Sequence, residues 1–259
     1  LLNLGDNFYA RANLKDDYEG VLSTSDPKWD LLWSEIYTGH LAKIPWWSVA
    51  GNHDWYGSPD AEVEKTGMDG NNWVLPDFFW DKTVKIGKKS LAFVFIDTDL
   101  LYYQYAGLTD KVELYANFKA HGWTPENHTI ETQLAHIESL LKKHDDKEYL
   151  MVIGHHPLVT CAAQANMTDL EALFDKYKPT AYAFGHQHSL AFARSGSTAY
   201  IQSGSGGKQE DVCPTTAAEA WGDASFGFVH SAWTEESVTF DYIDLNGNLV
   251  HTATATPRF

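Results

Sequence analysis

Side chains that can bind metal ions follow a glycine at four places in this 259-residue chain. The four motifs are Gly5-Asp6-Asn7, Gly51-Asn52-His53-Asp54, Gly154-His155-His156 and Gly185-His186-Gln187-His188. Carboxylate, amide and imidazole groups bind borderline ions such as zinc, manganese and iron. A single Gly-Asp is usually a turn, and a single histidine usually lies at the surface or forms a hydrogen bond. The prediction of a metal site therefore depends on all four motifs meeting in space.

Each motif directly follows an apolar segment that we expect to form a buried strand. These segments are residues 1–4, 46–50, 149–153 and 180–184. In open α/β sheets, ligands bind beyond the carboxyl ends of the strands, so the four polar loops should converge on one site. We expect Gly5, Gly51, Gly154 and Gly185 to let the backbone turn sharply there.

The segments between the motifs predict a sheet covered by helices. Residues 91–97 form a further apolar strand, and residues 130–144 form a helix with Leu134, Ile137, Leu140 and Leu141 on one face. A second helix is expected over residues 169–177, because the Lys178-Pro179 step disfavours helical geometry. Alternating residues 237–243, an Asn246-Gly247 turn and residues 249–253 predict a hairpin and a second antiparallel sheet.

The composition is that of a globular protein and limits its partners. The chain is 44% hydrophobic and has no apolar run long enough to span a membrane. Its length fits a single domain over residues 1–259. The formal net charge is −16, with no basic cluster, which makes nucleic acid an unsuitable partner. The expected oligomeric state is a monomer.

The cysteines and the asparagines give hints about the compartment. Cys161 and Cys213 are too few for a disulfide scaffold and wrongly spaced for a zinc finger, but they could form one bridge between two loops. Sequons begin at Asn127 and Asn166, and they would be glycosylated only in a secretory compartment. The acidic balance and the bridge fit a secreted or vacuolar/lysosomal protein.

The order of the four motifs resembles that of the calcineurin-like metallophosphoesterases. Gly5-Asp6-Asn7-Phe8-Tyr9 and Gly154-His155-His156-Pro157 resemble the purple acid phosphatase branch, in its small single-domain, tartrate-resistant type. Thr132-Gln133-Leu134, Ser203-Gly204-Ser205-Gly206 and the closing hairpin extend the resemblance over nearly the whole chain. The resemblance implies an α/β fold, a four-layer αββα sandwich of two mixed sheets flanked by helices.

The same resemblance implies a dinuclear metal centre of Fe(III) and a divalent ion, either iron, zinc or manganese. Asp6 would bridge the two ions, and Tyr9 and His188 would hold the ferric ion. Asn52, His155 and His186 would hold the divalent ion. Tyr9 is the diagnostic residue, because its phenolate would give the charge-transfer colour of the purple enzymes.

By resemblance, the activity is acid phosphatase hydrolysis of phosphate monoesters through attack of a metal-bound hydroxide. The substrate would be a phosphorylated small molecule or a phosphoprotein. His53 would contact the phosphate and help to protonate the leaving alkoxide. Asp54 would orient His53 or a ligand loop, or else form a turn or a surface salt bridge.

The chain departs from the family pattern at two places. The Asp-containing strand that normally precedes Gly5 is absent, and we expect a missing segment rather than a natural loss of the motif. Without it the ferric site lacks a ligand and a sheet edge is open. Gln164 stands where mammalian-type relatives have a substrate-facing histidine, and His156 would take over the role of that histidine.

Two other functions remain open at this point. The motifs indicate a reaction at phosphorus but do not identify the leaving group. A phosphodiesterase or nucleotide hydrolase on the same metal site is therefore one alternative. A catalytically silent scaffold or receptor is the other, because a fold does not guarantee activity. The aromatic residues after the second motif, Trp55, Tyr56, Trp73 and Trp80, are expected mainly in the core.

Overall fold

A seven-stranded mixed sheet forms the centre of the computed structural model, which describes residues 1–11, 17–68, 70–108, 112–162, 164 and 166–259. Its strands, in spatial order, are β10 (Glu219–Asp223), β8 (Leu190–Ser195), β9 (Thr198–Ser203), β7 (Ala181–Phe184), β6 (Tyr149–Ile153), β5 (Lys89–Ile96) and β4 (Phe79–Ile86). The inner strands β5, β6, β7 and β9 run parallel, and antiparallel pairs complete the sheet on both sides.

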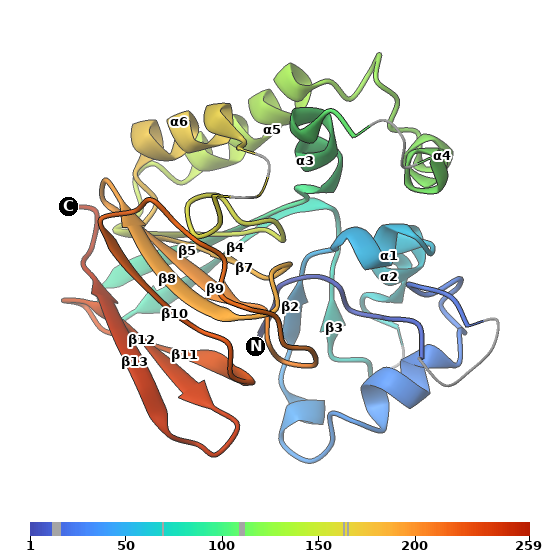
Figure 1. The fold of residues 1–259 in the computed structure, drawn as a ribbon, viewed down its shortest axis with the longest axis horizontal. Helices are drawn as coiled ribbons and strands as arrows, with labels where there is room; N and C mark the ends of the chain where they lie inside the picture. Colours follow the sequence, from blue (N-terminus) through green and yellow to red (C-terminus); the bar gives the residue numbers. More distant parts are fainter. Residues whose placement is uncertain (12–16, 69, 109–111, 163, 165) are drawn as a thin grey trace.

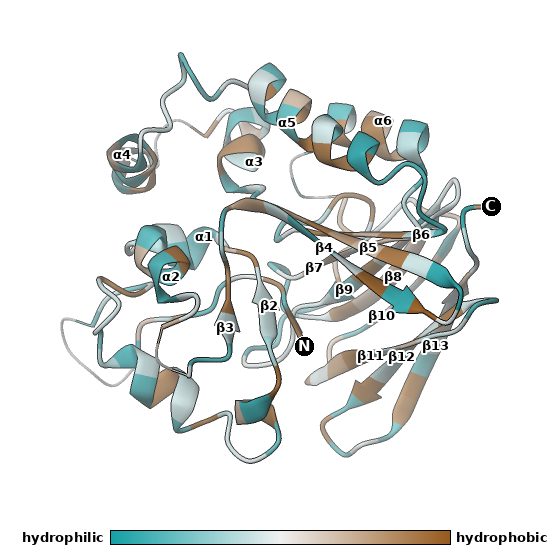
Figure 2. Ribbon diagram, turned by 180° about the vertical axis from the view of Figure 1, so that it is seen from behind, coloured by the Kyte–Doolittle hydropathy of each residue, from teal (hydrophilic) through white to brown (hydrophobic). Residues whose placement is uncertain are grey.

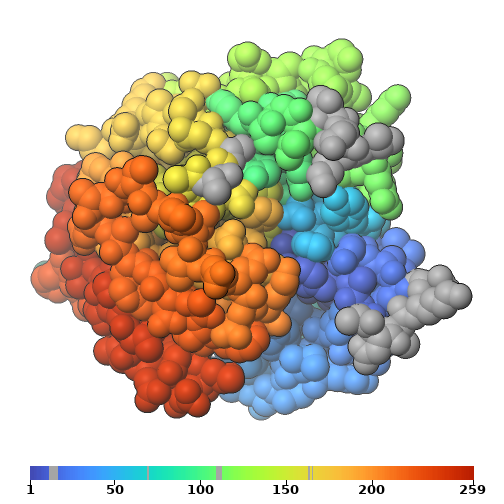
Figure 3. Space-filling model, viewed as in Figure 1, coloured from blue at the N-terminus to red at the C-terminus, as the bar shows by residue number. Residues whose placement is uncertain are grey.

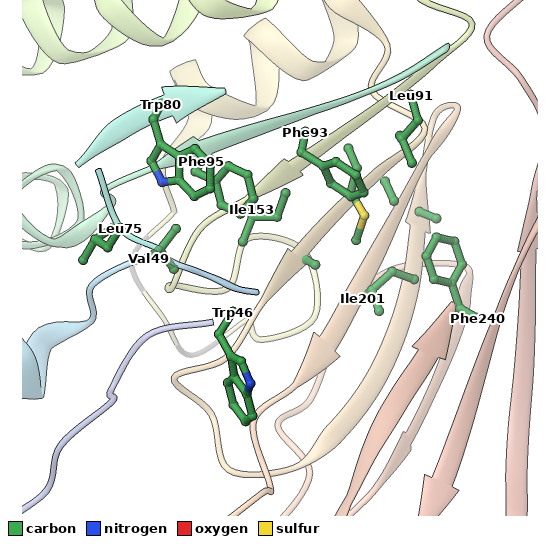
Figure 4. Close-up of a cluster of buried hydrophobic side chains, with 14 of the residues drawn as sticks. Trp46, Val49, Leu75, Trp80, Leu91, Phe93, Phe95, Ile153, Ile201 and Phe240 are labelled. Carbon is green, nitrogen blue, oxygen red and sulfur yellow. The ribbon is translucent and has the colours of Figure 1, made fainter. Parts of the chain in front are cut away.

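The two faces of this sheet belong to two separate hydrophobic clusters. Successive side chains of a strand point to opposite faces, so Phe93 and Phe95 lie in one cluster and Val94 in the other. Burial on both faces explains why β5 and β6 are almost continuously apolar rather than alternating. Figure 2 shows this hydrophobic colouring along the strands, and Figure 4 shows the first cluster around Phe93, Phe95 and Ile153.

Helices cover one face of the large sheet (Figure 1). They are α3 (Asp99–Ala106), α5 (Ile130–Lys143) and α6 (Thr168–Tyr177), whereas α4 (Val112–His121) lies to the side, near α1 (Asn52–Trp55). Ile137 and Leu141 of α5 are fully buried against the sheet, as the apolar face of this helix predicted. Helix α6 ends at Tyr177, directly before Lys178-Pro179, so both predicted helices are confirmed. Among the described residues, no helix is long and apolar enough to cross a bilayer.

Two three-stranded sheets cover the opposite face. One is parallel and consists of β1 (Leu2–Asn3), β2 (Trp46–Ser48) and β3 (Trp73–Val74). The other is antiparallel and consists of β11 (Gly227–Trp233), β12 (Val238–Asp244) and β13 (Leu249–Ala255). The second contains the predicted hairpin as β12 and β13. An apolar groove of about 560 Å³ lies between β1 and β11.

Short helical turns form the outermost layer beside β2 and β3. They are η1 (Trp29–Ser34) and η2 (Leu41–Lys43), and Trp33 of η1 packs edge-on against Trp46 and Trp73 at ring distances of 4.5 and 4.8 Å. The predicted α/β sandwich fold is therefore confirmed, with the second sheet in two parts. Trp55, Trp73 and Trp80 are buried as predicted, whereas Tyr56 is only partly buried.

The covalent and surface features agree with two of the expectations. Cys161 and Cys213 form a disulfide, with their Cα atoms 5.0 Å apart. Asn127 and Asn166 are both exposed, which is the placement that glycosylation requires. Glycosylation at these two residues stays a prediction.

Candidate metal centre

The four motifs come from two different sheets and meet at one place. β1 and β2 of the small parallel sheet end at the first two motifs, and β6 and β7 of the large sheet end at the last two. Helix α1 (Asn52–Trp55) begins inside the second motif, and α2 (Pro59–Lys65) follows it. The predicted convergence of the four loops is therefore seen in the structure.

The glycines serve this site mainly by allowing close approach. Gly5 has a left-handed backbone with φ of 88°, as a sharp turn requires. At Gly51, an added Cβ would lie 2.5 Å from both the backbone N and Oδ1 of Asp6. At Gly154 it would lie 2.5 Å from the hydroxyl of Tyr182. The expectation of a sharp turn thus holds for Gly5, whereas Gly51 and Gly154 are needed because other atoms occupy the space of a side chain.

Each of the six predicted metal ligands has a side-chain atom within 3.3 Å of a side-chain atom of at least one other. Asp6 Oδ2 accepts a hydrogen bond from the Tyr9 hydroxyl at 2.7 Å, and this hydroxyl lies 3.1 Å from His188 Nε2. Asp6 Oδ1 lies 3.3 Å from His155 Nε2. The His186 Nδ1 atom lies 2.9 Å from Asn52 Oδ1 and 3.3 Å from His155 Nε2. Asp6 thus stands between the Tyr9–His188 group and the Asn52–His155–His186 group.

A pocket of about 630 Å³ opens beside these donor atoms. Asp6, Tyr9, His155, His186 and His188 line it, together with Tyr37, Ser203, Gly204, Gly206, Gly207 and Lys208. In the space-filling view, the orange part of the chain that contains residues 203–208 meets the blue N-terminal part on one face (Figure 3). A ligand therefore has access to the donor atoms from solvent.

The profile of the calcineurin-like phosphoesterase family matches residues 1–190 of this chain. The chain belongs to this family.

Among its curated relatives are acid phosphatases of the purple type. The chain is 27% identical to purple acid phosphatase 7 of Arabidopsis thaliana over 270 residues, covering 100% of this chain and 76% of that protein. It is also 27% identical to tartrate-resistant acid phosphatase type 5 of Oryctolagus cuniculus, covering 95% of this chain and 76% of the relative. The resemblance to purple acid phosphatases that the motifs suggested is therefore confirmed.

Two solved structures share the fold. GAP50, described as the anchor in the inner membrane complex of Plasmodium, superimposes with a TM-score of 0.77 at 18% identity, over 100% of this chain and 78% of that one. The purple acid phosphatase PPD1 of yellow lupin seeds superimposes with a TM-score of 0.61 at 16% identity, over 98% and 53% of the two chains. At these identities the likeness concerns the fold alone.

Metallophosphoesterases of this family use divalent metals, and the donor set of this chain fits such ions. His155 Nδ1 lies 2.7 Å from the carbonyl oxygen of Leu4, so Nδ1 donates a proton there and Nε2 faces the pocket. His155 and His186 also have ring nitrogens within 4.8 Å of His156. Nitrogen and oxygen donors of this kind suit iron, zinc and manganese.

The electrostatics of the site also favour a cation. Burial and the adjacent Asp6 carboxylate raise the pKa of the Tyr9 phenol above its usual range. Burial opposes ionisation of Asp6, but the His155 ring holds the pKa of Asp6 below its usual range. A multivalent cation between these groups would stabilise both the Asp6 carboxylate and a Tyr9 phenolate.

Asp54 connects the first two loops from a fully buried position. Its carboxylate accepts hydrogen bonds from the backbone N–H groups of Gly51, Asn7 and Phe8, at 2.8, 2.8 and 3.2 Å. The Asn7 amide donates to both Asp54 and the buried carboxylate of Glu62, each at 3.0 Å. Asp54 therefore positions a ligand loop, and the alternative of a surface salt bridge is wrong.

The predicted catalytic histidine His53 lies beside Tyr9. The two rings are 4.2 Å apart, and the His53 backbone N–H donates to Asp6 Oδ1 at 2.9 Å. His53 Nδ1 lies 3.2 Å from Glu19 Oε2, and the side chain is 27% exposed. The ring is thus held next to the predicted metal ligands while it remains accessible to a substrate.

His156 and Gln164 lie outside this group. The His156 side chain is fully buried, stacks on the Tyr102 ring at 4.1 Å, and has its Nδ1 3.0 Å from Thr98 Oγ1. Gln164 accepts a hydrogen bond from the Tyr102 hydroxyl and lines a second pocket, next to Cys161. Their proposed contacts with substrate stay predictions.

Sequence reasoning missed four charged residues around the site. Glu62 and Glu19 contact Asn7 and His53, and Lys208 and Glu210 lie beside the pocket and next to His188. Each is distant in sequence from the motif that it contacts, or lies in a segment without periodicity. The glycine-rich run before Lys208 was the one available signal, because such runs approach ligands closely.

Proposed function

We propose that this protein is a dinuclear-metal acid phosphatase that hydrolyses phosphate monoesters. The observation that supports it most strongly is the arrangement of Asp6 between Tyr9 with His188 on one side and Asn52, His155 and His186 on the other. A mononuclear site would not need an oxygen donor shared between two groups of ligands.

In this proposal, Tyr9 and His188 would hold Fe(III), Asn52, His155 and His186 would hold iron, zinc or manganese in the divalent state, and Asp6 would serve both ions. When bound, the two ions supply charge neutralisation at phosphate oxygens and acidify a water molecule. Tyr9 selects for the ferric ion, because its buried phenol loses a proton only next to a strongly charged cation.

Residues around the metal ligands bind the phosphate group and protonate the leaving group. Lys208 is the only lysine or arginine among the described residues that line the pocket, so it supplies positive charge for a phosphate group on a chain of net charge −16. His53 donates a proton to the leaving alkoxide from its position beside Tyr9. Glu19 Oε2, at 3.2 Å from His53 Nδ1, holds the ring in this place.

The open pocket suits a phosphorylated small molecule or an exposed phosphoryl group of a protein. We place the enzyme in a secreted or vacuolar/lysosomal compartment, because the Cys161–Cys213 disulfide persists in an oxidising environment. We expect it to act as a monomer.

The test compares the wild-type protein with Tyr9→Phe after reconstitution with iron and zinc. The wild type should hold about two metal ions, absorb visible light through Tyr9, and hydrolyse a chromogenic phosphate monoester faster than the matching diester. Tyr9→Phe should lose the absorption band. Tyr37→Phe is the matched control, because Tyr37 lines the same pocket without contacting the predicted ligands.

Three outcomes would contradict the proposal. A folded wild type that binds no metal would support a silent scaffold instead. Faster hydrolysis of the diester would support a phosphodiesterase on the same site. A visible band that survives in Tyr9→Phe would exclude Tyr9 as the ferric ligand.

A further inference from the structure

The ring of His188, a predicted ferric ligand, contacts a residue that belongs to none of the four motifs. Its Nε2 lies 3.1 Å from the Tyr9 hydroxyl, on the side of the other donors. Its Nδ1 lies 3.2 Å from Oε1 of Glu210. Glu210 is in the segment between β9 and β10, which follows the last motif.

Glu210 is fixed to the loop of His188 by several contacts. Its backbone N–H donates to the His188 carbonyl oxygen at 2.8 Å. Its Oε2 accepts hydrogen bonds from the His188 backbone N–H at 3.4 Å and from the Gln187 amide at 3.1 Å. The carboxylate is therefore hydrogen-bonded to the backbone of His188 and has its other oxygen beside the ring of the same residue.

Lys208 also contacts this carboxylate. Its Nζ lies 2.9 Å from Glu210 Oε1, the oxygen that also faces His188. An ionised carboxylate next to Nδ1 favours the ring form with its proton on Nδ1.

We propose that Glu210 is a positioning residue for the metal centre, which holds His188 Nδ1 so that Nε2 faces the ferric ion. A carboxylate on the distal nitrogen of a histidine ligand fixes the ring orientation and raises the basicity of the ligating nitrogen. This inference rests on the proposed function for its ferric ion, but the orientation of the His188 ring is a property of the protein itself.

The experiment has one arm with metal and one without. Glu210→Ala and Glu210→Gln are compared with Glu219→Gln, a control in which the altered carboxylate pairs with Arg194 on the exposed edge of the large sheet. With iron, Glu210→Ala should bind the ion on the order of 10- to 100-fold more weakly than the wild type, whereas Glu219→Gln should bind it equally well. Glu210→Gln should lie between them.

Without metal, the nitrogen NMR signals of the His188 ring report its tautomer at a pH where the ring is neutral. The wild type and Glu219→Gln should have the proton on Nδ1, and Glu210→Ala should lose this preference. Circular dichroism checks that each variant is folded, and Glu210→Gln serves if the alanine variant is not.

The two arms separate the possible failures. If the wild type binds no iron, the proposed function fails, and the tautomer alone decides the role of Glu210. If the wild type binds iron and neither the affinity nor the tautomer changes in folded Glu210 variants, Glu210 does not position His188 and the inference is overturned.

Discussion

Two of the predicted metal ligands have a backbone conformation that non-glycine residues rarely adopt. Asp6 and His186 have φ angles of 54° and 62°. Each such residue costs roughly 1–3 kcal/mol, so it persists only where the surrounding contacts enforce it. For Asp6 these contacts include the backbone N–H of His53 and the hydroxyl of Tyr9. The strain is located at the residues that bring donor atoms into the pocket.

The close approach at Gly51 gives a prediction for single residues. In Gly51→Ala, the new Cβ must displace Asp6, because it would lie 2.5 Å from Asp6 N and Oδ1. A shift of the bridging carboxylate by a fraction of an ångström should lower kcat/KM for a phosphate monoester on the order of 100-fold. Metal content and steady-state kinetics measure the effect.

Gly207→Ala is the control for this substitution. Gly207 lines the same pocket, but an added Cβ there meets nothing within 4 Å. It should keep nearly full activity. Equal activities of the two alanine variants would show that the packing of Gly51 against Asp6 does not matter for the site.

At the scale of the elements, the site depends on how the end of β1 is joined to the start of α1. Asp6 follows the end of β1 and Asp54 lies in α1, 48 residues further along the chain. The Asp54 carboxylate joins them through the backbone N–H groups of Gly51, Asn7 and Phe8. No contact within one strand could replace this junction, because the strands β1 and β2 end before the ligand loops begin.

Loss of this junction should be costly for folding. Asp54→Ala leaves three backbone donors without their acceptor in a buried place, so we expect the free energy of unfolding to fall by roughly 3–5 kcal/mol. Urea denaturation measures the change. Asp60→Ala, which removes a half-exposed partner of His121 from helix α2, should cost less than about 1 kcal/mol. If both variants are equally stable, Asp54 does not join the two loops.

At the scale of the whole molecule, buried carboxyl groups couple the stability of the metal-free protein to pH. Asp97 is fully buried between β5 and α3, where it accepts hydrogen bonds from Trp55 Nε1 and from the backbone N–H of Asp99. Burial raises the pKa of Asp97 from 3.8 to about 7. Burial and Asp97 also raise the pKa of Asp99.

The sign of this coupling follows from the raised pKa. Between about pH 4 and pH 7, the unfolded chain has lost the Asp97 proton while the folded protein still holds it, so the stability falls as the pH rises through this range. The metal-free wild type should therefore be more stable at about pH 5 than at about pH 8, and Asp97→Asn should show a smaller difference. Urea denaturation in the presence of a chelator measures both. An unchanged pH dependence in Asp97→Asn would contradict the prediction.

The sequence by itself determined the kinds of donor and the loops that present them. Apolar strands ending in Gly-Asp, Gly-Asn-His and Gly-His are local patterns, so these strands, the helices α5 and α6 and five of the six predicted ligands could be proposed without coordinates. The sixth, Tyr9, was proposed only from the resemblance to the family. The Cys161–Cys213 bridge was also accessible, because these are the only two cysteines in the chain.

Only the tertiary structure showed which charged groups contact the predicted ligands and their loops. Glu62, Glu19 and Glu210 reach their partners through space, from outside the four motifs, and a solvated surface carboxylate has the same appearance in the sequence. The tertiary structure likewise separated His156 from its neighbour His155. Both side chains are buried, but His155 lines the pocket, whereas His156 stacks on Tyr102. The local pattern fixes residue type and loop position, whereas burial and long-range contacts depend on how the separate sheets pack together.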